Sequence, residues 1–407
     1  MKLGRYGLTA GILMACCVSF FIQAPSQVCA KKAKPDGTKQ EESKKSTWQP
    51  ELRIGVFEGQ TKANLQVSVP CVLLDAKTEK RIVFFSPGKT MKITVEDGNL
   101  VVDGKKVNAS RLILRPQEKK PISTMKVTIN GYEYPGGADI QLMRGSMVVN
   151  NLVACEDYLR GVLPEEMPPD WPEDALKAQA VAARTYALKH RGRHEKDGYD
   201  LCDTTHCQVY EGLDSATART DKAVSDTYGE VLTYQDKLIE AYFHTDSGGM
   251  TERCSDVWGT EVPYLQAAKE LQINTQPWTV NYSIKEFSDK LAAASRNVGT
   301  VKQVTLSKLS VGKGASDRSA SGRVKGLVVK GDKGTKTITG NEMRSILKLR
   351  STLFDVNISK NQVMIAGYGW GHGLGLSQWG AKAYADKWSY DKILYHYYKD
   401  TKLKKLY

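Results

Sequence analysis

The sequence lacks the short motifs of nucleotide-binding enzymes and serine hydrolases. The stretch GYGWGHGLGL fails the G-x-G-x-x-G dinucleotide fingerprint in every register, and SPGKT has Val83 where a phosphate-binding loop needs glycine. TDSGG lacks the first glycine of a nucleophile elbow, and Gly198 stands where a zinc-protease helix starting at His194 needs its second histidine. These absences argue against a nucleotide-dependent enzyme, a serine hydrolase and a helical zinc protease.

Cysteine is scarce outside the first 30 residues. Of eight cysteines, Cys16, Cys17 and Cys29 lie in that segment, which leaves five in the rest of the chain. Because five is odd, disulfide bonds cannot engage all of them. The five are Cys71, Cys155, Cys202, Cys207 and Cys254.

The first 30 residues are typical of an export signal. Lys2 and Arg5 precede an apolar run from Leu8 to Ile22, and small or short residues stand at Val28 and Ala30. We expect cleavage after Ala30. An uncut anchor is an alternative, since the run nearly reaches the roughly 20 residues that span a bilayer. A third interpretation is that Cys16 is a lipid-attachment site. All three place the protein outside the cytoplasm, and membrane contact is expected only through an uncleaved segment.

The charge and length of residues 31–407 indicate a linker followed by folded domains. Residues 31–50 are polar and charged, which predicts a disordered linker, and residues 51–407 suit two closely associated domains. The whole chain carries a formal charge of +13, of which residues 51–407 carry +8. A basic exported protein suits a polyanionic neighbour such as a bacterial cell wall or a membrane surface. Nucleic acid would fit the charge, but export argues against it.

The pattern of elements predicts a mixed α+β protein. The region after residue 51 contains short β-branched runs, and EDGNLVVDGKKV carries turn signals that favour hairpins. An alanine-rich helix is expected from Pro172 to about His190. A second α+β portion follows at 266–350, with helices at SIKEFSDKLAAASR and GNEMRSILKL and strands at VKQVTLSKLSV and GRVKGLVVKG.

Two adjacent glutamates, Glu165 and Glu166, lie in the proline-rich stretch PEEMPPDWP just before that helix. A stiff turn would fix their positions, and apolar neighbours such as Met167 and Trp171 would raise the pKa of Glu166 to that of a general acid. The alternative is that both glutamates are solvated and only favour the helix N-terminus.

Three further stretches could carry chemistry. Cys202, His206 and Cys207 lie within six residues, with His194 upstream, which fits either a zinc site or a Cys202–Cys207 disulfide. The turn after His244 could present polar groups to a ligand or be an ordinary tight turn. In GYGWGHGLGL glycines alternate from 367 to 375, so an extended strand would have a glycine face and an aromatic face suited to sugar rings. Such glycines also mark a strand that crosses closely over another element.

Taken in order, these stretches resemble the stage II sporulation protein D family, which includes the amidase enhancers. The resemblance rests on EDYLRGVLPEEMPPDWPEDALKAQAVAARTYAL, YDLCDTTHCQVYEG, AYFHTDSGGMTERCSDVWGTEVPYL, GRVKGLVVKG with RSILKLRSTLF, and GYGWGHGLGLSQWGAKAYA. It covers residues 140–400. It implies a catalytic domain at 140–265 and 356–407 with a smaller α+β lobe inserted at 266–355, and this domain follows the β-rich region at 51–139 that the residue pattern predicts.

The resemblance implies a peptidoglycan lytic transglycosylase. Such an enzyme cuts between N-acetylmuramic acid and N-acetylglucosamine, leaves a 1,6-anhydro end, and in the founding members acts on strands already stripped of peptide. The family's catalytic glutamate precedes Met-Pro, which here is Glu166, while Glu165 is a helper or bystander. One acid suffices because the sugar's own 6-hydroxyl is the nucleophile. The resemblance places a further set around the saccharide: Ser247, Gly248, Gly249, His372, Trp370 and Gln378.

The resemblance also bears on metal and partners. Some members of the family bind zinc through the segment that matches 194–207, which favours a structural zinc on Cys202, His206, Cys207 and His194 over the disulfide. Cys155 and Cys254 are not part of the family pattern, and we expect them to pair with each other. Glycan strands are the expected partner, and an N-acetylmuramoyl-L-alanine amidase is a second. The alternative function is a non-catalytic wall-binding enhancer of that amidase.

Overall fold

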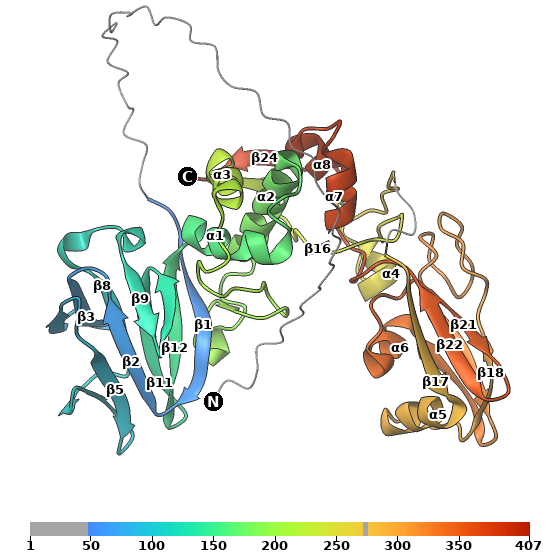
Figure 1. The fold of residues 1–407 in the computed structure, drawn as a ribbon, viewed down its shortest axis with the longest axis horizontal. Helices are drawn as coiled ribbons and strands as arrows, with labels where there is room; N and C mark the ends of the chain where they lie inside the picture. Colours follow the sequence, from blue (N-terminus) through green and yellow to red (C-terminus); the bar gives the residue numbers. More distant parts are fainter. Residues whose placement is uncertain (1–47, 272–275) are drawn as a thin grey trace, which may run out of the picture. The chain divides into compact units, whose positions relative to one another are not determined.

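The computed structural model describes residues 48–271 and 276–407 (Figure 1). In this part of the chain twelve strands precede the first α-helix, and helices then mix with short strands, so the predicted α+β class is confirmed. The predicted export segment and almost all of the predicted linker lie outside the described residues. No helix in the described ranges has the length and apolar character needed to cross a membrane.

The N-terminal part consists of two sheets. One sheet has the strand order β13-β1-β12-β11-β8-β3-β4 and the other β10-β9-β2-β5-β6-β7. Two Asp-Gly pairs with positive φ, at 97–98 and 103–104, turn the chain between β5, β6 and β7, as the hairpin prediction requires. The strands are β1 Glu51–Gln60, β2 Lys62–Val67, β3 Cys71–Asp75, β4 Arg81–Phe85, β5 Met91–Glu96, β6 Asn99–Val102, β7 Lys105–Lys106, β8 Arg111–Pro116, β9 Lys126–Ile129, β10 Tyr132–Pro135, β11 Gly137–Met143, β12 Ser146–Ala154 and β13 Leu201–Cys202.

Alternation of side chains explains how these sheets pack. In β8 every second residue is buried, and β2 shows the same period of two, so each strand turns one apolar face inward. Leu65 of one sheet and Leu114 of the other belong to a single apolar core. Burying a side chain of this size stabilises the fold by roughly 1.5–3 kcal/mol. The same core continues into the helices that follow.

The helical part centres on α2, which confirms the predicted alanine-rich helix. Its alanines are buried, so neighbouring helices approach closely, and the guanidinium of Arg184 forms a buried ion pair with Glu156 of α1 at 2.7 Å. The elements here are α1 Cys155–Glu166, α2 Glu173–Lys189, α3 Ala218–Asp226, β14 Glu230–Tyr234, β15 Lys237–Leu238, β16 Phe243–His244, α4 Cys254–Trp258, β23 Leu376–Ser377, α7 Gln378–Tyr384, α8 Tyr390–Tyr397 and β24 Lys402–Lys405.

A lobe between α4 and β23 has an apolar core of its own. It contains the sheets β17-β22-β21 and β18-β19-β20, and both of its helices begin with a capping box, at Ser283 and Thr339. The helices and strands predicted for 266–350 are confirmed. The elements are β17 Trp278–Ser283, α5 Ile284–Ala293, β18 Val301–Thr305, β19 Gly326–Gly331, β20 Gly334–Thr339, α6 Gly340–Leu347, β21 Phe354–Ile358 and β22 Gln362–Gly367.

Strand pairing divides the chain at other places than the resemblance does. The predicted boundaries after residues 139 and 355 fall inside β11 and β21. Since β12 pairs with β1 and β22 pairs with β17, the N-terminal sheets extend to Ala154 and the lobe extends to Gly367. After the lobe the chain returns to the helical part, where β23 pairs in parallel with β16.

Candidate active site

Glu166 is the last residue of α1, and this corrects the expected stiff turn. Both glutamates lie in the final turn of a helix that runs from Cys155 and contains Pro164, and the chain becomes extended at Met167 (φ −132°, ψ 135°). The proline that follows Met167 disfavours a helical conformation there, which ends α1 at Glu166. Met167 and Trp171 are buried, as expected, whereas Glu165 is exposed.

Glu166 is half-buried, and its carboxyl group is largely removed from solvent. Burial raises its pKa to about 7, and the nearby charge of Glu165 adds to this. Two hydrogen bonds act in the opposite direction: the Nε2 of Gln378 donates to Oε2 at 3.2 Å, and the backbone N–H of Val209 also donates. The net effect is a carboxyl group that is half protonated near neutral pH, as a general acid requires.

Glu166 borders a cavity of about 720 Å³. The walls come from α1, α2, the 205–209 loop, β16, α4, α6 of the lobe, the segment after β22 and the first residue of α7. Two exposed tryptophans, Trp258 and Trp370, give it aromatic surface at its rim, with 47% and 43% of each side chain exposed. A saccharide can stack its ring faces on such groups. The lining residues that carry polar or aromatic groups are Glu165, Glu166, Tyr186, Arg193, Thr205, His206, Cys207, Tyr242, Phe243, His244, Thr245, Trp258, Arg344, Trp370, His372 and Gln378.

Two neutral histidines form part of the wall, with ring centroids 5.4 Å apart. Burial lowers the pKa of His244 well below its ordinary value and that of His372 to about 3. The Nδ1 of His244 donates to the carbonyl of Leu374 at 3.1 Å, which leaves Nε2 as an acceptor. The Nδ1 of His372 accepts from the N–H of Leu374 at 2.9 Å, which leaves its proton on Nε2. The two rings therefore offer different hydrogen-bonding edges.

The glycine-rich segment is not the extended strand that alternation predicted. β22 ends at Gly367, and the next four alternating glycines all have positive φ, between 66° and 112°. A Cβ at Gly371 would lie 2.6 Å from the Cβ of His244, and one at Gly373 would lie 2.8 Å from the guanidinium of Arg323. The glycines therefore serve left-handed backbone and close approach, while Trp370 and His372 reach the cavity.

Ser247, Gly248 and Gly249 are buried and do not line the cavity. The N–H of Gly249 donates to the Ser247 hydroxyl at 2.9 Å, and the Ser247 carbonyl accepts from Arg323 at 3.0 Å. Their turn lies under the glycine-rich segment, since Asp246 pairs with Trp370 in an antiparallel bridge. Of the predicted saccharide-binding residues, the structure therefore brings Trp370, His372 and Gln378 to the cavity. The predicted residues 247–249 lie behind its wall.

The four predicted metal ligands converge beside the cavity. The ligand atoms of His194, Cys202, His206 and Cys207 lie within 4.8 Å of one another. The Nε2 of His194 is 3.2 Å from Nδ1 of His206 and 3.4 Å from the sulfur of Cys207. On the far side of His194, Nδ1 lies 3.1 Å from a carboxylate oxygen of Asp197.

The expected pairing of Cys155 with Cys254 is wrong. All five cysteines of the described residues are free, and these two lie at the starts of different helices, α1 and α4. Both are buried, and burial raises the pKa of the Cys155 thiol to about 12, which makes it an unreactive core residue.

Several cavity residues were not identified by the sequence analysis, among them Arg193, Tyr242, Trp258 and Arg344. Tyr242 and Trp258 pack edge to face at 4.8 Å, and Trp258 lies 5.7 Å from His372. Tyr242, Trp258 and Arg344 lie within stretches that carry the family resemblance, but no local pattern singles them out, because the four residues reach the cavity from separate segments. The pairing of Gln378 with Glu166 was equally hidden, since 212 residues separate the two.

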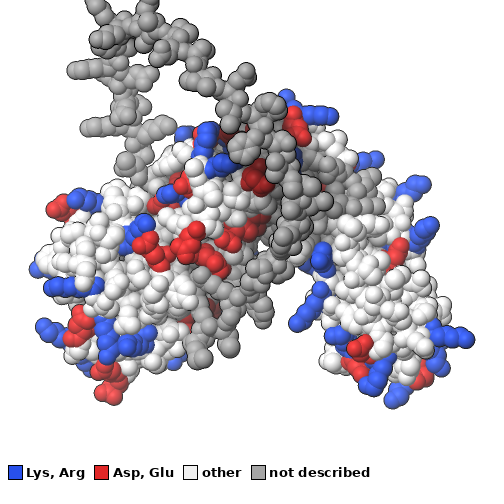
Figure 2. All heavy atoms as spheres, viewed as in Figure 1, with Lys and Arg blue, Asp and Glu red and all other residues white. Residues whose placement is uncertain are grey.

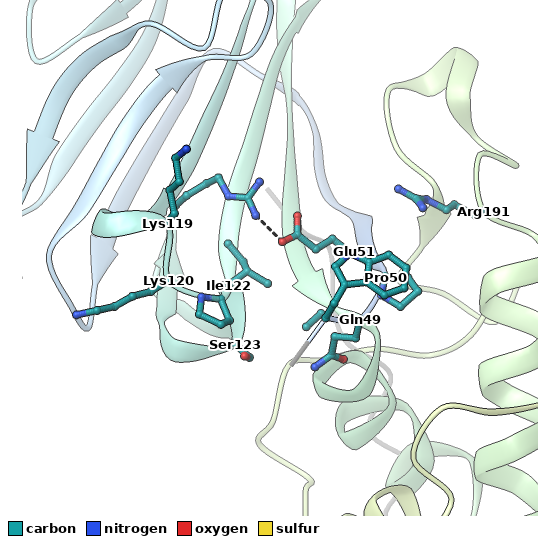
Figure 3. Close-up of a pocket in the computed structure, with 12 residues that line it drawn as sticks. Gln49, Pro50, Glu51, Lys119, Lys120, Ile122, Ser123 and Arg191 are labelled. Carbon is teal, nitrogen blue, oxygen red and sulfur yellow. Dashed lines mark hydrogen bonds and ion pairs between the residues drawn. The ribbon is translucent and has the colours of Figure 1, made fainter. Parts of the chain in front are cut away.

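A second cavity, of about 530 Å³, lies at the start of the described chain (Figure 3). Lys119, Lys120 and Arg191 line it, together with Arg115, which forms an ion pair with Glu51. Because its one carboxylate is engaged by that ion pair, this cavity holds no acid comparable to Glu166. The candidate catalytic centre is therefore the cavity beside α1.

Comparison with known proteins finds two family models that match parts of this chain. The family model described as stage II sporulation protein matches residues 143–234, and a domain of unknown function matches 266–375, which encloses the lobe. An uncharacterized protein of Brachyspira hyodysenteriae is 32% identical over 354 residues, covering 85% of this chain and 91% of its own length.

Two relatives carry descriptive names. The amidase enhancer of Bacillus subtilis is 31% identical over 366 residues, which is 79% of this chain but only 50% of the relative. Stage II sporulation protein D of Bacillus amyloliquefaciens is 32% identical over 265 residues, covering 60% of this chain and 73% of the relative. This chain belongs to the stage II sporulation protein D family.

Proposed function

We propose that this protein is a lytic transglycosylase of bacterial cell-wall glycan, with Glu166 as its general acid and base. Family membership supports a cell-wall-related role. The observation that carries the finer proposal is a shielded carboxyl group, with its pKa raised to about 7, at a cavity with aromatic walls. The proposal places the protein outside the cytoplasm, where its substrate lies.

The chemistry needs one acid. Protonated Glu166 gives its proton to the glycosidic oxygen as the bond from C1 of N-acetylmuramic acid breaks and N-acetylglucosamine departs. The 6-hydroxyl of the same muramic acid attacks C1, and the carboxylate takes the hydroxyl proton, which yields the 1,6-anhydro end and restores the acid. No water enters, so the second carboxylate of a hydrolase is not required. The exposed Glu165 needs no role in these steps.

Gln378 fits a supporting role in this cycle. Its Nε2 donates to Oε2 of Glu166 and stabilises the carboxylate that forms after the first proton transfer. The Val209 N–H does the same from the loop that follows Cys207. These two donors hold the carboxyl group in position and keep its pKa from rising further, so that the group both gives and regains a proton near neutral pH.

We further propose that the cluster beside the cavity holds a structural zinc ion. Two thiolates and two imidazoles are a preferred zinc set, and bonds of about 2.0–2.3 Å in tetrahedral geometry bring ligand atoms to the kind of separations seen between His194, His206 and Cys207. Asp197 would orient His194 through its other ring nitrogen. With four protein ligands the site would be closed, so its role would be to pin the 205–209 loop, which contributes Val209 to Glu166.

The test is product analysis on defined glycan. The full chain, its Glu166→Gln variant and the neighbouring Glu165→Gln variant are each incubated with amidase-stripped glycan strands, and products are identified by mass spectrometry. We expect 1,6-anhydro products from the native protein and from Glu165→Gln, and none from Glu166→Gln. Anhydro products from Glu166→Gln at the native rate would refute the assignment of the acid.

A second candidate is a non-catalytic enhancer of an N-acetylmuramoyl-L-alanine amidase. The relative named amidase enhancer and the basic lobe favour it. In that case no anhydro product forms from stripped or intact wall, and the amidase is stimulated equally by the native protein and by Glu166→Gln. Stimulation that requires Glu166 would speak against this alternative.

A further inference from the structure

Arg344 places a positive charge in the cavity from the lobe. It lies on α6, it lines the cavity with Trp258 and Trp370, and its side chain is half-buried. Its Nε donates to the carbonyl of Leu349 at 3.3 Å, and the described residues offer it no ion pair. Loss of hydration on burial lowers the pKa of its guanidinium, and no nearby carboxylate counteracts this.

Among the described residues, three other arginines that leave solvent pair with a carboxylate, whereas the buried Arg323 forms no ion pair and donates to the carbonyls of Ser247 and Gly371. Arg184 pairs with Glu156 at 2.7 Å, Arg53 with Asp200 at 2.8 Å, and Arg318 with Asp355. A guanidinium that loses water without such a partner costs stability, since its charge is not compensated. The charge of Arg344 is uncompensated in this way, and its side chain lies in a cavity that a ligand can enter.

No carboxylate of the described residues acts on Arg344 to balance the charge of its guanidinium. The groups on which the charge of Arg344 acts are the neutral His244 and His372 and a second cation, Arg323. The carboxyl groups of the cavity, those of Glu165 and Glu166, belong to α1. We therefore expect the anionic partner of Arg344 to belong to the ligand that the cavity binds.

The lobe as a whole is strongly basic. Residues 276–370 contain sixteen Lys and Arg and six Asp and Glu, a formal charge of +10, whereas the whole of residues 51–407 carries +8. Figure 2 shows cationic side chains over the drawn face of the lobe, with most of the acidic ones there gathered at its lower end. A field of this sign attracts an anionic strand toward the cavity.

We propose that Arg344 binds a carboxylate of the glycan strand, namely the lactyl carboxylate that each N-acetylmuramic acid exposes once its peptide has been removed. This rests on the proposed function, because it takes wall glycan as the ligand of the cavity. A guanidinium matches a carboxylate with two parallel hydrogen bonds. In intact peptidoglycan the same lactyl group is a neutral amide, which leaves Arg344 uncompensated. Arg344 thereby makes the cavity selective for peptide-free strands, and the domain of unknown function at 266–375 supplies that selectivity.

The experiment compares two peptide-free ligands that differ only in charge. One is an oligosaccharide from amidase-stripped glycan, and the other is the same oligosaccharide with its lactyl carboxylates converted to methylamides. Binding is followed by tryptophan fluorescence in the Glu166→Gln protein, so that no turnover occurs, with and without Arg344→Gln, Arg344→Lys or Lys330→Gln. Lys330 is exposed in β19 and lies outside the cavity, so its variant removes the same charge from the same lobe.

We expect Arg344→Gln to weaken binding of the free carboxylate roughly ten- to a hundredfold, as for a lost charged hydrogen bond, and to leave binding of the methylamide unchanged. Arg344→Lys should recover part of the loss, and Lys330→Gln should behave as the parent. Equal binding of both ligands by the parent, or an equal loss for both in Arg344→Gln, would overturn the proposal. Melting temperatures of the variants separate a folding defect from a binding defect.

Turnover separates this proposal from the proposed function. If the native protein makes no anhydro product but binds the free carboxylate through Arg344, the transglycosylase proposal fails and the present one stands. If it makes product from both ligands at equal kcat/KM, the transglycosylase stands and the selectivity of Arg344 is refuted. When both hold, the loss in Arg344→Gln should lie mainly in KM for the free carboxylate.

Discussion

Replacing Glu166 with glutamine should stabilise the protein at pH 8 and leave its stability at pH 4.5 unchanged. Glutamine has the shape of the protonated acid, and its side-chain oxygen can still accept from Gln378 and from the Val209 N–H. The substitution therefore removes the ionised form without removing a contact. What it tests is the claim that burial, rather than the hydrogen bonds, dominates the electrostatics of this carboxyl group.

The magnitude follows from the pKa. In the folded protein the pKa of Glu166 is about 7, against an ordinary value of 4.5. Between these values the folded state binds more protons than the unfolded state, so the free energy of unfolding falls as the pH rises through this window. One pKa unit corresponds to about 1.4 kcal/mol, so the full loss above pH 7 is about 3 kcal/mol. Partial access of solvent to the residue makes this an upper value.

Urea unfolding at pH 4.5, 6 and 8 measures the effect, with Glu165→Gln as the matched control. The gain from Glu166→Gln over the native protein should be near zero at pH 4.5 and should grow to between about 1 and 3 kcal/mol at pH 8. Glu252 and Glu270, whose pKa values burial also raises to about 7, are present in every variant and cancel in the difference. A gain that is the same at all three pH values, or a loss at pH 8, would refute the reasoning.

Three more predictions follow from the site. Gln378→Leu removes a hydrogen-bond donor that lowers the pKa of Glu166. The pH above which kcat/KM falls should therefore rise, and a fall at the same or a lower pH would contradict this. Cys202→Ser should lower both the bound zinc, about one per chain in the native protein by elemental analysis, and the melting temperature. Gly373→Ala should lower the melting temperature more than Gly88→Ala, because both have positive φ but only Gly373 faces a guanidinium; equal losses would contradict the clash.

Local patterns predicted the regular parts of the fold well. Alternating burial in the N-terminal strands, the capped helices of the lobe and the alanine-rich α2 each follow from residues close in sequence. The exception is α1, where three nearby prolines favoured a turn. Pro164 lies inside this helix, and a proline in a helix interior costs about 3 kcal/mol or more. The buried Leu159 and Val162 offset that cost by packing in the apolar core, which the local sequence of α1 does not predict.

The glycine-rich segment shows how a correct pattern gave a wrong conformation. Strict alternation has the same period as a strand, but it also allows every second residue to adopt positive φ, and the latter is what the chain does. The conformation depends on two distant residues that occupy the space beside these glycines: His244, which precedes Gly371 by 127 residues, and Arg323, which precedes Gly373 by 50. Of the aromatic residues expected to share one face, Trp370 and His372 line the cavity, whereas Tyr368 is not among its lining residues.

Desolvation explains the charges of the cavity with a single cause. Removal of water disfavours any ionised group, so it raises the pKa of Glu166 and lowers those of His244, His372 and Arg344. The acid is then partly protonated and the imidazoles are neutral, whereas a guanidinium starts from so high a pKa that it stays charged. Such a cavity combines a proton donor with a fixed cation and excludes a charged imidazole. These are the properties that cleavage of a carboxylate-bearing glycan by one acid requires, and they depend on the lobe as much as on α1.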